Sequence, residues 1–209
     1  MRNKEFAAIR PVLAGVQNPV IVELGAHRGE ESKFFNRLVN ANTLTHIMVE
    51  PDPENFLKLA AGANSRNVIN AAAWSNHEIR TFHRAKEIDR NGDRQSGSLL
   101  VPTGHMAAFP AIVFDSDIMV QCVPLDWVFE DKALQRIDLL WVDIQGSERE
   151  MIRGGQKALA ATRYLFMEVE EREMYGGQAM KSELIAMLPG WKVVGDFGFN
   201  VLMRNGKFN

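Results

Sequence analysis

The chain has 209 residues, of which 46% are hydrophobic and 24% charged, and its formal net charge is −2. This length and composition predict a single globular domain over residues 1–209, with enough chain for a sizeable core. A charge balance so close to neutral argues against duplex nucleic acid or an anionic membrane as the main partner.

Signals for export, membrane insertion and disulfide bonding are also missing from the sequence. The sole cysteine, Cys122, allows no disulfide within the chain. The first residues carry scattered charges, and no apolar run approaches the length of a membrane span. We therefore expect a cytoplasmic protein that crosses no membrane.

Apolar runs bounded by turn residues predict strands that alternate with helices. The predicted strands are residues 20–24, 45–50, 67–73, 78–83, 120–123, 137–144, 164–169, 191–194 and 199–203. Helices are predicted over residues 3–13, over 180–188, and after the turns at 25–29, 51–53, 124–126 and 147–150. This order predicts an α/β, Rossmann-like fold: a mostly parallel sheet with helices on both faces and an antiparallel hairpin at its end.

Two segments stand outside this alternation. Residues 1–17 are expected to form a helical flap over the sheet edge. Residues 84–117 are expected to be an irregular insertion on the substrate side, because glycines or prolines punctuate them at positions 92, 97, 102, 104 and 110. A segment of this length in a compact domain is typical of a functional lid.

Two helix starts carry recognisable capping residues. Asp52 stands as N-cap before Pro53, whose missing N–H costs nothing in the first turn. Ser147 and Glu150 have the spacing of a capping box, in which Glu150 reaches back to the Ser147 amide. Both patterns predict a helix directly after the carboxyl end of a strand.

The turn after the first strand has features of a ligand site. Glu23 ends a buried strand, where a carboxylate must be paired. The following turn has glycines at positions 25 and 29, a Gly-x-x-x-Gly spacing that differs from the G-x-G-x-x-G of dinucleotide sites. A pyrophosphate would be repelled by Glu23, whereas the ammonium of S-adenosylmethionine would be attracted. We therefore predict an S-adenosylmethionine site at this turn.

Two further carboxylates end predicted strands. Glu50 lies 21 residues after Gly29, where doubly wound nucleotide folds place a carboxylate that accepts ribose hydroxyls. Asp143 ends the most apolar strand, and ligands of such sheets bind outside the carboxyl ends of strands at the switch point. We expect Glu23 and Asp143 to converge there.

The segments 23–29 (ELGAHRG), 49–51 (VEP) and 137–148 (IDLLWVDIQGSE), with Gly154-Gly155 and the closing FNVL at 199–202, resemble the FkbM-type methyltransferase family. The resemblance implies a class I methyltransferase fold whose seven-stranded sheet has an antiparallel last strand. It also implies O-methylation of a hydroxyl on a small molecule such as a sugar or secondary metabolite.

By position, the resemblance implies a set of cofactor-binding residues, with Glu23, Gly25 and Gly29 at the methionine end, Glu50 at the ribose, Asp52, Ala72 and Ala73 near adenine, and Asp143 near the sulfonium. The whole set comprises Glu23, Gly25, Ala26, His27, Gly29, Glu50, Pro51, Asp52, Ala72, Ala73 and Asp143. Two positions depart from the family pattern: His27 stands where Asn is usual, and Gln145 where Glu is usual.

Methyl transfer to an aliphatic hydroxyl needs a base as well as in-line positioning. Asp143, Glu168 and His105 are the candidates, and we favour Asp143. Ser98, His105, Gln145 and Glu168 are expected to face the substrate. No histidine or carboxylate spacing matches a known metal loop, so no metal is predicted.

Two alternatives compete with an active O-methyltransferase. One is a module that binds the cofactor but has lost turnover, as the loss of a carboxylate at Gln145 suggests. The other is a nicotinamide-dependent oxidoreductase, which Glu23 argues against.

Overall fold

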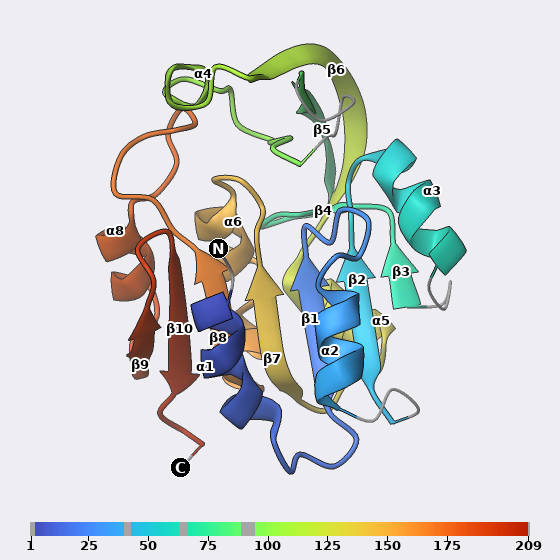
Figure 1. Ribbon diagram of the computed structural model, residues 1–209, viewed down its shortest axis with the longest axis vertical. Coiled ribbons are helices and arrows are strands. Elements are labelled where there is room, and N and C mark those ends of the chain that lie inside the picture. Colours follow the sequence, from blue (N-terminus) through green and yellow to red (C-terminus); the bar gives the residue numbers. More distant parts are fainter. Residues whose placement is uncertain (1–2, 40–42, 63–66, 89–94, 209) are drawn as a thin grey trace.

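The computed structural model describes residues 3–39, 43–62, 67–88 and 95–208. Its main sheet has seven strands in the order β3-β2-β1-β7-β8-β10-β9 (Figure 1). Their bounds are β1 Val20–Leu24, β2 Thr45–Val49, β3 Val68–Ile69, β7 Ile137–Val142, β8 Thr162–Glu168, β9 Trp191–Asp196 and β10 Asn200–Asn205. Among these described strands, β10 pairs antiparallel with both β8 and β9, and all the other pairs are parallel. The predicted Rossmann-like sheet with an antiparallel last strand is confirmed.

The strand order reverses between β1 and β7. From β1 the chain steps outward to β2 and β3, and it then returns to the other side of β1 through β7. Such a switch point opens a crevice at the carboxyl ends of the two strands, because their connections leave in opposite directions.

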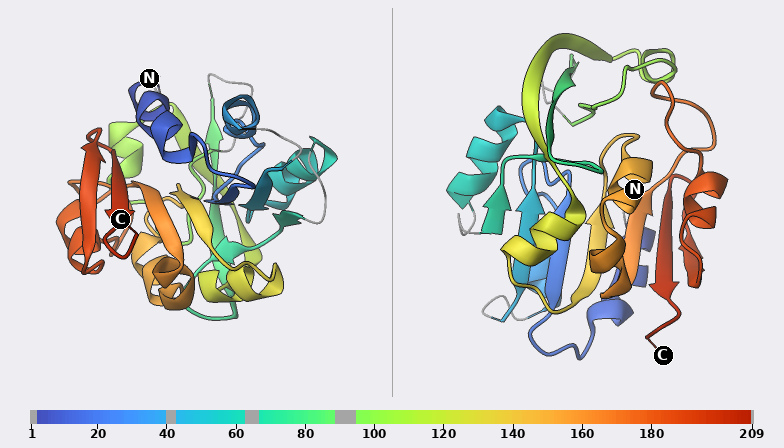
Figure 2. Two further views of the ribbon diagram at one scale, coloured as in Figure 1. Left: turned by 90° about the horizontal axis from the view of Figure 1, so that it is seen from below. Right: turned by 180° about the vertical axis from the view of Figure 1, so that it is seen from behind.

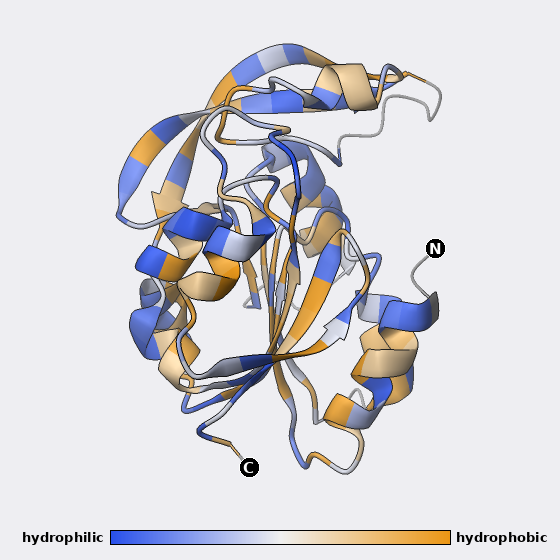
Figure 3. Cartoon of the chain, turned by 90° about the vertical axis from the view of Figure 1, so that its left-hand side faces the viewer, coloured by the Kyte–Doolittle hydropathy of each residue, from blue (hydrophilic) through white to orange (hydrophobic). Residues whose placement is uncertain are grey.

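Helices cover both faces of this sheet (Figure 2). One face carries α1 Asn3–Leu13, α2 Ser32–Leu38 and α3 Pro53–Gly62. The other carries α5 Leu125–Asp131, α6 Glu148–Arg153, α7 Gln156–Ala160 and α8 Lys181–Ala186. Apolar strands lie between the two helical layers (Figure 3). The short helix α7 is not anticipated by the sequence reading.

The alternation of side chains along each strand divides the core. Ile21 and Trp141 pack under α1 and α2, whereas Val22 and Val142 pack on the opposite face. The helix α1 therefore lies against the sheet face over Trp141, rather than on the sheet edge as expected.

A second sheet of three strands arches over the carboxyl ends of the main sheet (Figure 1). It comprises β4 Ala72–Ala73, β5 Glu78–Glu87 and β6 Ile112–Val123, and α4 His105–Ala108 lies in the connection between β5 and β6. The predicted strand 67–73 is thus two strands in two different sheets. The side chain of Asn70, between them, donates to the carbonyl oxygens of Glu50 and Pro51.

Two local predictions are wrong. Regular structure extends into the segment 84–117, because β5 and β6 pair antiparallel from Glu78 to Glu87 through backbone hydrogen bonds; residues 89–94 lie outside the described part of the chain. The capping box is absent: Ser147 precedes α6 without a side-chain cap, and Glu150 pairs with Arg153 instead. No described helix has the length and apolarity that a membrane crossing needs.

Candidate active site

Two adjoining cavities lie at the switch point. The first, of about 370 Å³, is lined by residues of the β1 turn, the ends of β2 and β7, and β4. The second, of about 690 Å³, extends toward the end of β8 and the connection after it. Both are lined by Asp143, Gln145 and Gln95. We call them the β1 cavity and the β8 cavity.

The floor of the β1 cavity depends on Gly25. This residue has φ +80°, and a Cβ atom there would lie 1.8 Å from the carbonyl oxygen of Asp143. The N–H of Asp143 in turn donates to Leu24 O at 3.0 Å. Only glycine permits this approach of the two strand ends, and it leaves the backbone of the turn open to a ligand.

His27 adopts an unusual backbone conformation in the same turn and contacts two glutamates. Its φ of +48° lies in the left-handed region, which Asn and His enter more readily than most residues. Its N–H donates to Glu50 Oε2 at 2.8 Å, and its ring Nδ1 lies 2.8 Å from Glu30 Oε1. The ring pair and local amides hold the pKa of Glu30 below its ordinary value against the opposing effect of burial.

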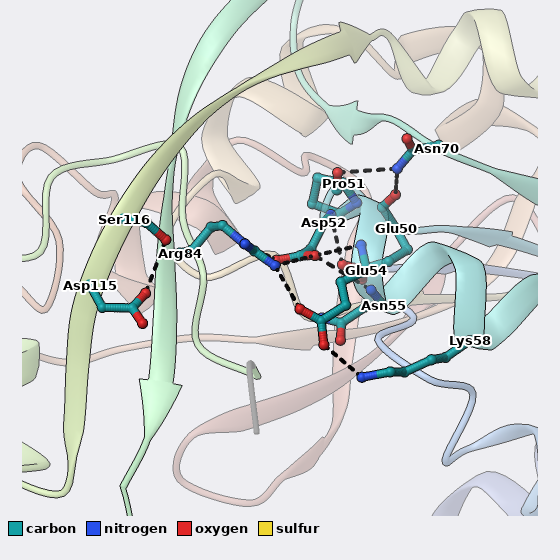
Figure 4. Close-up of polar contacts among 10 residues, drawn as sticks. All are labelled: Glu50, Pro51, Asp52, Glu54, Asn55, Lys58, Asn70, Arg84, Asp115 and Ser116. Atoms are coloured by element: carbon teal, nitrogen blue, oxygen red, sulfur yellow. Dashed lines mark hydrogen bonds and ion pairs between the residues drawn. The ribbon is translucent and has the colours of Figure 1, made fainter. Parts of the chain in front are cut away.

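Glu50 presents a buried carboxylate at the end of β2 (Figure 4). Its Oε1 accepts from the Asp52 N–H at 2.9 Å, and its Oε2 from His27. Burial raises its pKa to about 7 despite these two amides. Each oxygen retains a further lone pair, so the group can still accept hydroxyl hydrogens.

Asp52 caps α3 as predicted, through Oδ1 bonds from the amides of Glu54 and Asn55. It is also gripped by Arg84 of β5, whose Nε and Nη2 lie 2.6 Å and 3.0 Å from its two carboxylate oxygens (Figure 4). This fork ties the arching sheet to the main one. Asp52 consequently does not line the β1 cavity.

Part of the wall of the β1 cavity is apolar. Ala72 and Ala73 of β4 line it, with Phe82 of β5 and Phe6 of α1. Near them the Oγ of Ser147, buried and without a hydrogen-bond partner among the described residues, lines the same cavity. A planar apolar group flanked by a few polar contacts suits this wall.

The β8 cavity contains a group of polar side chains, of which Asp143, Gln145 and Glu168 are half-buried. The Gln145 amide Nε2 donates to Asp143 Oδ1 at 2.7 Å and to Glu168 Oε2 at 2.6 Å. Burial and the nearby Asp143 carboxylate raise the pKa of Glu168 well above its ordinary value. Glu148 is buried beside them, and burial raises its pKa to about 7.

His105 and Tyr175 form an aromatic wall of the same cavity, with ring centroids 5.3 Å apart. His105 is 4% exposed, and its Nδ1 has no hydrogen-bond partner among the described residues. Burial lowers its pKa. At neutral pH the ring is thus an uncharged donor or acceptor.

Ser98 lies behind the site rather than in it. Its Oγ donates to the carbonyl oxygen of Gln145 at 2.6 Å and accepts from the Leu100 N–H at 3.0 Å. It lines neither cavity. The expected contact of Ser98 with substrate is therefore corrected to support of the Gln145 backbone.

Glu23 also lies outside both cavities. It is 1% exposed, and its Oε2 pairs with His46 Nε2 at 2.8 Å, beneath Phe35 of α2. Its Oε1 has no partner among the described residues. This buried carboxylate is paired, as its burial requires, but with His46 instead of a ligand, and the predicted convergence of Glu23 with Asp143 in the crevice is wrong.

Residues 23–200 match the family described as the methyltransferase FkbM domain. The chain belongs to this family. A 2-O-methyltransferase, NoeI, of Sinorhizobium fredii (strain NBRC 101917 / NGR234) is 30% identical to it over 203 residues, which cover 91% of this chain and 81% of that protein.

Among solved structures, the methyltransferase FkbM of Methylobacillus flagellatus KT has a TM-score of 0.54 and 17% identity, over 92% of this chain and 45% of that one. The chain thus spans less than half the length of this solved relative, and at such identity the likeness concerns the fold. The predicted class I methyltransferase fold is confirmed.

The predicted cofactor set divides by position in this FkbM-family fold. The members that line the β1 cavity are Gly25, His27, Glu50, Pro51, Ala72, Ala73 and Asp143. Those outside its lining are Glu23, Ala26, Gly29 and Asp52. The sequence analysis did not propose Phe6, Glu148 and Tyr175 as lining residues. Of these three, only Glu148 could have been found, because it directly follows Ser147 at the end of the segment 137–148 that resembles the family.

Proposed function

We propose that this protein is an S-adenosylmethionine-dependent O-methyltransferase that acts on a hydroxyl of a small molecule. The observation that carries the proposal is the junction of two cavities at Asp143 and Gln145. A donor in the β1 cavity and an acceptor in the β8 cavity would meet there, as in-line transfer requires. The 2-O-methyltransferase named among the relatives supports a hydroxyl acceptor.

The β1 cavity fits S-adenosylmethionine in three respects. Gly25 lines the cavity, and its lack of a side chain lets the ends of β1 and β7 approach each other there. Glu50 offers carboxylate oxygens for ribose hydroxyls, and Ser147 of the same cavity offers a hydroxyl without a hydrogen-bond partner among the described residues. When bound, this cofactor would supply an electrophilic methyl group.

Charge favours this cofactor over a dinucleotide. Glu30, Glu31, Glu50 and Asp143 line the β1 cavity. Such a lining attracts a ligand with sulfonium and ammonium groups and repels a pyrophosphate. This argument replaces the one drawn from Glu23 and again disfavours a nicotinamide-dependent oxidoreductase.

On the acceptor side, we assign the base to Asp143, because it alone among the three candidates borders both cavities. Gln145 positions it by donating a hydrogen bond to it and to Glu168, and His105 is an uncharged contact for the acceptor. We infer no metal ion and no nucleic-acid partner in this reaction.

Calorimetric titration with S-adenosylhomocysteine tests the cofactor site, with NADH as the matched comparison. Heat of binding is expected from the first ligand only. Asp143→Asn should keep most of this affinity and lose methylated product, scored by mass spectrometry on sugars and polyketide alcohols. Binding without product in the wild type would favour the module that has lost turnover, and binding of NADH alone would refute the proposal.

A further inference from the structure

The amide of Gln145 occupies a position between two carboxylates. Its Nε2 donates to Asp143 and Glu168, at the ends of the adjacent strands β7 and β8, and its Oε1 accepts from the Tyr175 hydroxyl at 2.7 Å. A primary amide has two N–H donors and one carbonyl acceptor. This arrangement uses all of them, and it fixes which end of the amide faces the carboxylates.

The backbone holds the amide in this orientation. Gln145 has φ +51°, a left-handed conformation that is uncommon for a residue with a long side chain. Its carbonyl oxygen is fixed by the buried Ser98 hydroxyl, and Ser98 is fixed in turn by two backbone bonds to His83. An uncommon conformation supported from behind in this way indicates that the position of the side chain matters.

A neutral amide is an unusual group to find between converging carboxylates. Buried carboxylates are ordinarily compensated by a basic side chain or by a metal ion. The Gln145 amide donates to one oxygen of each carboxylate but adds no positive charge. The remaining repulsion between the carboxylates is then relieved by a proton, in keeping with the raised pKa of Glu168.

We propose that Gln145 replaces a cation at this site: it is a positioning residue that holds Asp143 and Glu168 as a metal-free pair sharing one proton and one negative charge. The inference rests on the proposed methyltransferase function, in which the pair receives the acceptor's proton. As the new O–CH₃ bond forms and the S–CH₃ bond breaks with its electrons left on sulfur, the O–H proton passes to the pair. The pair becomes neutral and returns the proton to water in the β8 cavity.

Other titratable groups face the pair and must be separated from it in any test. Glu148, whose Oε1 accepts a hydrogen bond from the Gly146 N–H, lines the β8 cavity together with Lys4, Glu170, Tyr175 and His105. For this reason the experiment does not depend on a pH profile. It uses Mn²⁺ as a probe, because Mn²⁺ binding shows whether a cation can occupy the position of the Gln145 amide.

The test compares Gln145→Glu with Gln135→Glu. Both add one carboxylate, but Gln135 precedes β7 at the opposite end of the sheet and its amide contacts only a loop carbonyl among the described residues. Wild type and Gln135→Glu are expected to bind no Mn²⁺ by paramagnetic resonance and to melt at one temperature with Mn²⁺ or EDTA. Gln145→Glu should melt lower in EDTA and be restored by Mn²⁺, because three carboxylates at one point form an oxygen site for this ion.

Further variants separate the possible outcomes. Adding Asp143→Asn to Gln145→Glu should abolish the rescue. In wild type at neutral pH, carboxyl carbon NMR should contain a protonated glutamate signal that Glu168→Gln removes. Mn²⁺ bound by wild type and lost in Asp143→Asn, or a spectrum that Glu168→Gln leaves unchanged, would overturn the inference even where Gln145→Glu fails to fold. Titration of wild type with S-adenosylhomocysteine reports separately on the proposed function.

Discussion

The affinity for the cofactor should fall at acidic pH because of Glu50. Burial raises the pKa of this carboxyl to about 7 in the free protein, although two backbone amides donate to it. Ribose hydroxyls donate hydrogens, and only the ionised carboxylate can accept them at both oxygens. Binding therefore requires Glu50 to lose its proton, and acidification competes with the cofactor.

The size of the effect follows from the pKa. If the hydroxyls return the pKa of Glu50 from about 7 to its ordinary value of 4.5, the difference corresponds to about 3 kcal/mol. The dissociation constant should be nearly constant above neutral pH. It should then rise by about tenfold for each pH unit below 7, to a limit of roughly 300-fold.

The opposite sign is expected for folding. A raised folded-state pKa adds stability that is fully present below the unfolded pKa and is lost as pH rises through the folded value. The contribution of Glu50 to the free energy of unfolding should accordingly decline between about pH 4.5 and about pH 7. Acid thus stabilises the fold at this residue while it weakens ligand binding.

The assay is calorimetric titration with S-adenosylhomocysteine across this pH range, in two buffers of different ionisation enthalpy that count the released proton. Glu50→Gln should bind about 1.5–3 kcal/mol more weakly at alkaline pH and should lose the pH dependence. An equally steep pH dependence in Glu50→Gln would refute the reasoning, since another group would then be responsible.

Two further predictions concern the frame around the site. Gly25→Ala should destabilise the protein by about 3 kcal/mol or more in urea unfolding, because its Cβ would overlap the Asp143 carbonyl; Gly15→Ala, with a similar φ of +75° and open space, should cost only about 1 kcal/mol. Arg84→Met should lower the unfolding free energy by about 2–3 kcal/mol, since it leaves the Asp52 carboxylate buried with only its capping bonds. A Gly25→Ala variant as stable as Gly15→Ala, or an unchanged Arg84→Met, would contradict these arguments.

The sequence predicted the sheet and its turns where local signals and tertiary packing agree. The strands β1, β2 and β7 are short apolar runs that are buried on both faces, so composition alone reveals them. Gly25 and Asp143 followed from their places at strand ends. These two residues are also the ones whose backbones meet in the structure.

The arching sheet could not be predicted in the same way. Only residues 78–83 of β5 and 120–123 of β6 were predicted as strands; the rest of β5 is rich in charged residues, and the rest of β6 is half exposed with two aspartates, so neither shows an apolar alternation. The two strands are held together by ten cross-strand residue pairs, with a bulge between Arg84 and Ala85. Arg84 also connects β5 to the main sheet through its ion pair with Asp52. Pairing between residues so far apart leaves no pattern in either segment by itself.

Glu23 illustrates a different limit. It was placed in the crevice because it is near the end of β1, but side chains along a strand alternate between faces. Glu23 shares the face of Ile21, beneath α2, where its hydrogen-bond partner on the adjacent strand is His46. The end of a strand brings the backbone to the crevice, but the face on which a side chain lies decides whether that side chain enters the crevice.

The alternation of side chains along a strand also explains why several residues that line the β1 cavity directly follow a strand. Gly25, Glu50 and Asp143 directly follow β1, β2 and β7, so they are free of the two-residue alternation and turn toward the switch point. The carboxylates that result favour a cationic donor. Under the proposed function, transfer of the methyl group removes that positive charge, so the same carboxylates hold the neutral product less strongly. Binding of the donor and release of the product then depend on one arrangement of charge.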